Sequence, residues 1–148
     1  MCGIPENIAK LIQLLSEALS EEERTNVVIF GSAAIVLHGV HLDRKVGDLD
    51  VFASYLTFER ISERYPVQAK PAKEGGDVPV IQPYADIEIL KSFLGVEFEK
   101  VFNNAVKLEG AGEFKVGCLA DLKAWKFAQG RSKDLADIKA IDRQAGLA

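Results

Sequence analysis

The chain has 148 residues, of which 48% are hydrophobic and 27% are charged, and its formal net charge is −4. This length and composition are typical of one soluble globular domain with its own core. The acidic balance argues against broad nonspecific binding to nucleic acid or anionic membranes, and no apolar run is long enough to span a bilayer. Because Cys2 and Cys118 lie far apart and the first residues do not resemble a signal peptide, we expect a reduced, cytoplasmic protein.

The first half of the chain alternates between helical and strand patterns. Apolar residues recur at helical spacing over 8–19, which predicts an amphipathic helix, and a charged linker follows over 21–26. We then expect a buried strand over 27–30, a helix over 32–37 with Gly39 as its stop, a polar loop over 41–45, a second strand over 46–53, and a helix over 57–65 that Thr57 caps and Pro66 ends.

The second half contains further strands and a pair of helices. We expect an exposed loop over 70–77, strands over 78–81 and 85–90 with a break at Gln82-Pro83, and a hairpin from 105–108 and 114–117. A helix over 119–129 is expected to stop at Gly130, and Ser132 can cap a last helix over about 133–143. Strands interleaved with helices, together with a hairpin, indicate an α+β or α/β sheet with helices packed on it. No domain boundary is apparent, so we expect one domain over 1–148, which begins with a helix in 1–20 and ends with a helical pair in 119–148.

Two carboxylates lie at a spacing of two in the second predicted strand, Asp48 and Asp50. Residues i and i+2 of a strand point to the same face, so these side chains would start roughly 6.5–7 Å apart. Their repulsion would be removed by one Mg²⁺ ion, or two, since Mg²⁺ prefers oxygen ligands. The alternative is a surface strand with polar outward positions. D-x-D triplets also occur in haloacid-dehalogenase-type phosphatases and in sugar-nucleotide glycosyltransferases.

Two further features support nucleotide chemistry. Gly31-Ser32 follows a buried strand and begins a helix, where a tight backbone and free N–H groups attract phosphate oxygens, although such a corner is more often a simple helix start. A third acid is expected on a neighbouring strand, and the segment over 85–90 offers both Asp86 and Glu88. A solvated edge strand would explain either of these acids equally well.

Cations gather at the joint between the last two predicted helices. Lys126 lies on a helix face between Trp125 and Phe127, where it could contact a triphosphate, and Arg131 and Lys133 could do the same. The alternative interpretation is a charged surface that keeps the protein soluble. Asp134 and Asp137 are interpreted as helix-start and i,i+3 ion-pair partners that hold the joint together.

Together these residues resemble the nucleotidyltransferase superfamily with a polymerase-beta-like palm, and more narrowly the AbiEii-like toxin group and its small relatives. The motifs that carry the resemblance are Gly31-Ser32, Arg44 before Asp48-Leu49-Asp50, Glu88 followed by Gly95-Val96-Glu97-Phe98, and Lys126 followed by the segment over 130–137. The alignment places Glu88, rather than Asp86, as the third acid. Two departures are Val46, where the group commonly has Thr, and Glu88 itself, where Asp is usual.

The resemblance implies an α+β fold of the nucleotidyltransferase type and a Mg²⁺-dependent transfer of a nucleoside monophosphate from an NTP to a hydroxyl of RNA, protein or a small molecule. It implies catalytic and metal-ligand roles for Asp48, Asp50 and Glu88, and nucleotide-binding roles for Gly31, Ser32, Arg44, Lys126 and Arg131. A tRNA or a protein is the expected acceptor, and no membrane is involved. The alternative is an inactive nucleotide-binding or protein-interaction module, including one that pairs with an antitoxin-type protein.

Overall fold

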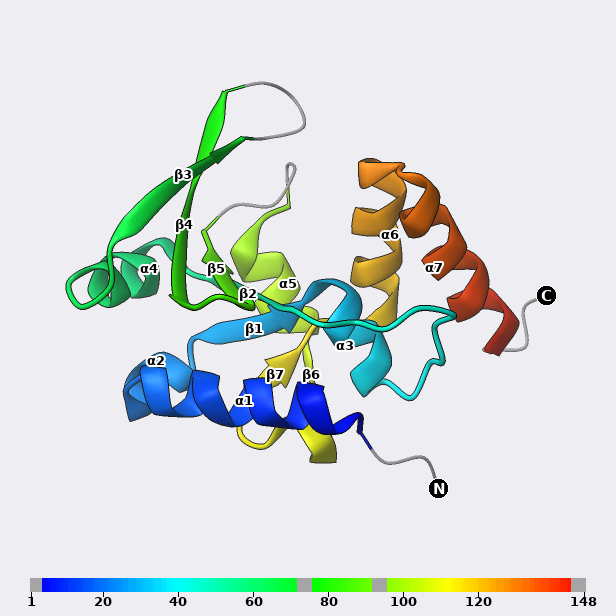
Figure 1. Cartoon of the computed structure of the whole chain (residues 1–148), viewed down its shortest axis with the longest axis horizontal. Coiled ribbons are helices and arrows are strands. Elements are labelled where there is room, and N and C mark those ends of the chain that lie inside the picture. Colours follow the sequence, from blue (N-terminus) through cyan, green and yellow to red (C-terminus); the bar gives the residue numbers. More distant parts are fainter. Residues whose placement is uncertain (1–3, 72–75, 92–95, 145–148) are drawn as a thin grey trace.

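A mixed β-sheet forms the centre of the protein in a computed structural model, which describes residues 4–71, 76–91 and 96–144 (Figure 1). Within these residues the sheet has seven strands in the order β3-β4-β5-β2-β1-β7-β6. The strands are β1 (Val27–Phe30), β2 (Leu49–Ala53), β3 (Val67–Pro71), β4 (Asp77–Tyr84), β5 (Ile87–Leu90), β6 (Val106–Lys107) and β7 (Lys115–Val116). β2 pairs with β5 and β1 pairs with β7 in parallel, whereas the other neighbours are antiparallel.

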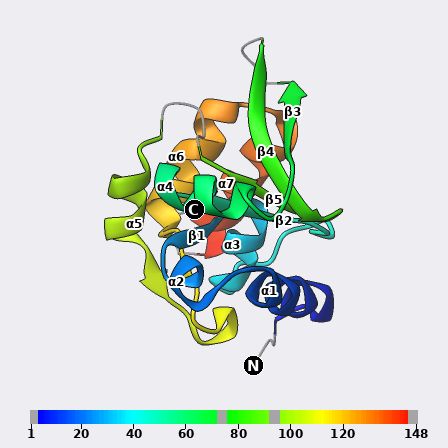
Figure 2. The same cartoon turned by 90° about the vertical axis from the view of Figure 1, so that its left-hand side faces the viewer.

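Helices cover the sheet on both faces, and their combination with a mixed, mainly antiparallel sheet confirms the α+β class. They are α1 (Glu6–Ala18), α2 (Glu21–Arg24), α3 (Gly31–Leu37), α4 (Tyr55–Ser62), α5 (Phe98–Asn104), α6 (Leu119–Gln129) and α7 (Ser132–Gln144), with a 3-10 turn over Glu109–Ala111. Figure 2 shows α1 and α5 on opposite sides of the sheet. In the described part of the chain, no helix has the length and apolar character required to cross a membrane.

The core lies where the central strands meet these helices. All four residues of β1 are buried, and β2 is buried at every position except Asp50, which is partly exposed. The buried face of α1 includes Ile8 and Leu15, and Phe98 of α5 meets Phe52 edge-on with ring centroids 5.3 Å apart. Since β1 and β2 are enclosed, Asp50 is a carboxylate placed at the edge of a hydrophobic core.

Several predicted elements agree closely with the structure. The strand over 27–30 and the helix over 119–129 have the predicted bounds, and Gly130 ends α6 in the left-handed conformation with φ of 67°. The predicted hairpin is present as β6 and β7, which the 3-10 turn connects. These elements are specified by short-range signals, namely an apolar run, helical periodicity and a glycine stop.

The predicted linker over 21–26 is wrong, because Ser20 begins a helix there. The Ser20 hydroxyl accepts a hydrogen bond from the Glu23 amide at 3.2 Å, and the Glu23 carboxylate accepts one from the Ser20 amide at 2.9 Å. This reciprocal pair is a capping box. Glu23 is also buried against Arg64, which adds a tertiary contact that the local charge pattern does not reveal.

The predicted start of the second strand at residue 46 is also wrong, because β2 begins at Leu49. The carbonyl of Val46 accepts a hydrogen bond from the Asn7 side chain of α1 at 2.7 Å. The backbone of residue 46 is therefore bonded to a helix rather than to a neighbouring strand. Asp48 lies in the segment just before the strand, so Asp48 and Asp50 do not share one regular strand.

Other boundaries differ because proline and serine act differently from their expected roles. Ser54, not Thr57, caps α4, since its hydroxyl accepts the Thr57 amide at 3.2 Å. The expected loop over 70–77 contains the ends of β3 and β4, and Pro71 is tolerated because β3 is an edge strand. Pro83 does not end β4; it lies where the pairing with β5 shifts register.

The helix α5 was not predicted. Residues 72–75, Gly95 and Cys2 lie outside the described residues.

Candidate functional site

The predicted glycine corner is built where β1 passes directly into α3. Gly31 has a φ of 72°, a left-handed conformation that glycine adopts readily. A Cβ atom at Gly31 would lie only 2.6 Å from Oδ2 of Asp50, which stands opposite Phe30 in the β1–β2 register. Gly31 is therefore required both by its backbone angle and by the carboxylate packed against it. The corner and Asp50 form one site.

The structure brings the three predicted acids into one electrostatic group. Asp50 and Glu88 are direct neighbours in the parallel pairing of β2 with β5, and Asp48 precedes β2. Burial first, and then the charges of Asp48 and Glu88, raise the pKa of the Asp50 carboxyl to about 7, against the opposing charges of Lys126 and Lys70. The fold thus holds carboxylates together against their repulsion. Asp86, the alternative third acid, is exposed in the turn before β5.

Glu88 has a partner that the sequence did not suggest. Lys70, near the end of β3, forms an ion pair with Glu88, whose side chain is 17% exposed. In the described ranges, no group of three His, Cys, Asp or Glu side chains is arranged to hold a metal ion. Lys70 was missed because it lies in an expected loop and is 18 positions from Glu88, with no motif to connect them.

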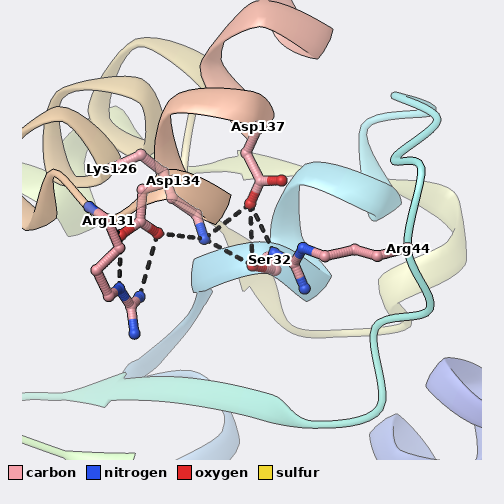
Figure 3. A network of polar contacts seen from close by, with 6 residues as sticks. All are labelled: Ser32, Arg44, Lys126, Arg131, Asp134 and Asp137. Carbon is pink, nitrogen blue, oxygen red and sulfur yellow. Dashed lines mark hydrogen bonds and ion pairs between the residues drawn. The ribbon is translucent and has the colours of Figure 1, made fainter.

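Lys126 lies at the centre of a second polar cluster, which is buried (Figure 3). Its side chain is 2% exposed, and its ammonium donates to the Ser32 hydroxyl at 2.7 Å. The same Nζ lies 3.2 Å from Oδ1 of Asp134 and 3.0 Å from Oδ2 of Asp137, both on α7. The cluster therefore ties the glycine corner to the last two helices. We call the residues labelled in Figure 3 the Ser32 network.

Two arginines complete the Ser32 network from its edges. Arg44 donates to the Ser32 hydroxyl at 2.8 Å and to Asp137 at 2.7 Å. Arg131 holds both oxygens of Asp134, at 2.6 Å from Nε and 3.1 Å from Nη2. Burial acts to raise the pKa of Asp134, but hydrogen bonds from Arg131 and Lys126 outweigh it and hold that pKa below its usual value.

The Ser32 network unites the polar residues for which nucleotide binding was predicted, and it adds two acids to them. The i,i+3 ion pair expected of Asp134 is confirmed, and its partner is Arg131. Asp137 behaves differently, because it pairs across the fold with Lys126 and Arg44 rather than within its own helix. Lys126 is fully buried rather than partly buried, and its charge is paired with Asp134 and Asp137 inside the protein. Lys133 is exposed and takes no part in the network.

Asp50 lies between the two clusters. Lys126 from α6 and Lys70 from β3 both act on its charge, although they belong to opposite sides of the molecule. Figure 1 shows the β3–β4 hairpin and the α6–α7 pair rising on the same side of β1 and β2, one at each end. The cluster of acids around Asp50 therefore lies between two cations, Lys70 from the β3–β4 hairpin and Lys126 from the α6–α7 pair.

No protein-family model matches the sequence, and no curated protein matches it. Among solved structures, the chain is similar to the crystal structure of JHP933 from Helicobacter pylori, with 14% sequence identity and a TM-score of 0.44. The similar region covers 92% of this chain and 66% of the JHP933 chain, so this chain spans just under two thirds of that protein's length. A similarity at this level assigns neither a fold family nor a function.

Proposed function

We propose that this protein is a Mg²⁺-dependent nucleotidyltransferase with a nucleotidyltransferase-like fold, which moves a nucleoside monophosphate from an NTP to a hydroxyl of RNA, protein or a small molecule. The observation that carries the proposal is the position of Asp50. Its carboxylate repels those of Asp48 and Glu88 and is packed against the Gly31 corner. A purely structural strand gains nothing from such repulsion. A binding site for a cation and phosphates explains it.

The donor chemistry of this group fits Mg²⁺, which prefers carboxylate oxygens. Asp48, Asp50 and Glu88 would hold the ion. Their side chains are not grouped around an ion position in this structure, so Glu88 would have to leave Lys70 and turn toward the other two acids. When bound, Mg²⁺ would neutralise the carboxylates and the triphosphate. Because the pKa of Asp50 is raised to about 7, protons compete with the ion for this carboxylate near neutral pH. We therefore expect metal binding to strengthen as the pH rises through 7.

Ser32 is the residue we assign to phosphate binding. Its oxygen accepts hydrogen bonds from Lys126 and Arg44, and its own proton makes only a long contact of 3.4 Å with Asp137. A hydrogen bond of that length is weak, so the proton can be given to a phosphate oxygen instead. Lys126 then acts through Ser32, because its buried ammonium does not reach solvent. We propose that it positions the hydroxyl rather than touching the nucleotide.

The two arginines remain available for the leaving pyrophosphate. The side chains of Arg44 and Arg131 are 34% and 46% exposed, so part of each guanidinium faces solvent while another part binds Asp137 or Asp134. Charge that develops on a pyrophosphate is stabilised by such preorganised cations. Because phosphoryl chemistry depends mainly on positioning and electrostatics, no covalent nucleophile is required of this chain.

The second candidate is an inactive nucleotide-binding or protein-interaction module, including the partner of an antitoxin-type protein. One observation favours it: Lys126 is engaged by Asp134 and Asp137, and Glu88 is engaged by Lys70, so internal partners already satisfy these charges. An inactive module would bind an NTP with no dependence on Mg²⁺, or would not bind it.

The test of the main proposal is a transfer assay with labelled NTPs, Mg²⁺ and an acceptor pool that includes tRNA. We expect transfer by the wild type and its loss in Asp50→Asn and Glu88→Gln. Asp86→Asn is the matched control, because it removes one exposed charge two positions from Glu88. Loss of transfer in Asp86→Asn but not in Glu88→Gln would reassign the third acid. Absence of both transfer and NTP binding in the wild type would overturn the proposal.

A further inference from the structure

The β3–β4 hairpin is an arm that stands out from the sheet. β3 is the edge strand, and all five of its residues are exposed. Figure 2 shows β3 and β4 extending well above β1, β2 and β5. Val67 is 47% exposed, although a valine in a supporting strand is usually covered. β3 is paired with β4 along its whole length but contributes little to the core.

Lys70 is the residue of this arm that reaches the acidic site. β4 separates β3 from β5 in the sheet, yet the Lys70 ammonium pairs with the Glu88 carboxylate of β5. Its charge also acts on Asp50. The Lys70 side chain is 51% exposed, so water competes for its ammonium, and an ion pair with an exposed partner contributes little to stability. A cation that binds Glu88 more strongly can therefore displace Lys70 from this ion pair.

We propose that Lys70 is a displaceable cation, which neutralises Glu88 in the ligand-free protein and moves to the phosphates of the nucleotide when Mg²⁺ and NTP bind. This inference rests on the proposed function and deepens it. Mg²⁺ and the Lys70 ammonium compete for the same carboxylate, because the two cations repel each other and each weakens the binding of the other. A Mg²⁺–triphosphate retains net negative charge, so the released ammonium has a new partner close by.

The proposal predicts opposite effects on two ligands. Removing the Lys70 charge removes a competitor of Mg²⁺, so Mg²⁺ alone should bind more tightly. It also removes a phosphate contact, so the nucleotide with Mg²⁺ should bind more weakly. A residue that merely supports the fold would shift both affinities in the same direction. A surface lysine that acts only through its long-range charge would shift both affinities only slightly.

The experiment measures both affinities for the wild type, Lys70→Met, Lys70→Arg and Lys10→Met. Lys10 is an exposed lysine of α1 and controls for loss of one positive charge. MgCl₂ alone is titrated first, and each of the four NTPs is then titrated at saturating Mg²⁺. For Lys70→Met we expect Mg²⁺ to bind about two- to fivefold more tightly. We expect the best NTP to bind about tenfold more weakly. Lys70→Arg should keep both wild-type affinities within about twofold, since it retains the charge.

The outcomes separate this inference from the function on which it rests. If the wild type binds Mg²⁺ and an NTP, but Lys70→Met leaves both affinities unchanged or shifts them in the same direction, Lys70 is not the displaceable cation and the proposed function stands. If the wild type binds neither ligand, both proposals are refuted. Circular dichroism confirms that each variant is folded, and Lys70→Gln replaces the methionine variant if that one is not.

Discussion

Replacing Asp50 by asparagine should stabilise the protein, although Asp50 belongs to the candidate site. Burial and the charges of Asp48 and Glu88 raise its pKa from the ordinary 3.8 to about 7. A raised folded-state pKa for an acid means that the folded protein binds a proton more tightly than the unfolded chain. Folding is then favoured at low pH and loses free energy as the pH rises from about 4 through 7.

The magnitude follows from the size of the pKa shift. The change from 3.8 to about 7 is roughly three units, and each unit corresponds to about 1.4 kcal/mol. At pH 8, ionised Asp50 therefore destabilises the folded state by up to about 4 kcal/mol, or about 2 kcal/mol if solvent at the partly exposed carboxylate screens half of the effect. At pH 5 the penalty is smaller by about 1–3 kcal/mol, because the folded carboxyl is still protonated.

Urea denaturation of the wild type and Asp50→Asn at pH 5, 6, 7 and 8 measures this directly. We expect the variant to be more stable at every pH, with an advantage that grows by about 1–3 kcal/mol from pH 5 to pH 8. Saturating Mg²⁺ should stabilise the wild type at pH 8 and have little effect on the variant. A stability difference that is flat across this range, or a variant less stable at pH 8, would refute the electrostatic description of the site.

Two further predictions concern the residues around Asp50. Lys126→Met should lower the free energy of unfolding by about 3 kcal/mol, because Asp134 and Asp137 lose a buried cation. Each of these acids keeps one arginine as a partner, Arg131 and Arg44 respectively. Lys123→Met, which removes a half-exposed lysine of the same helix, should change it by less than about 1 kcal/mol in the same denaturation assay. Gly31→Ala should destabilise the protein by about 1–3 kcal/mol, since alanine is strained at a φ of 72° and its Cβ would press on Asp50. A thermal melt of Gly31→Ala that matches the wild type would contradict the close packing of this corner.

The site residues divide according to how far their partners lie along the chain. Arg131 and Asp134 pair at a spacing of three, and this contact could be predicted from helix geometry. Asp137 was expected to act in the same local way, but its partners are Arg44 and Lys126, from two other parts of the chain. The local pattern predicts that Asp137 forms an ion pair. Its partners are determined by the tertiary fold, which places α7 against α6 and beside Arg44.

The local sequence by itself determined the buried strand of β1, the helix α6 with its glycine stop, the tight corner at Gly31 and the presence of acids at Asp50 and Glu88. These features depend on backbone propensity and on the alternation of apolar and polar residues, which act over a few positions. The tertiary structure alone decided that Lys126 is buried and that Lys70 reaches Glu88. The reason is that burial and charge pairing depend on which strands become neighbours, and sheet order joins segments that are far apart in the chain.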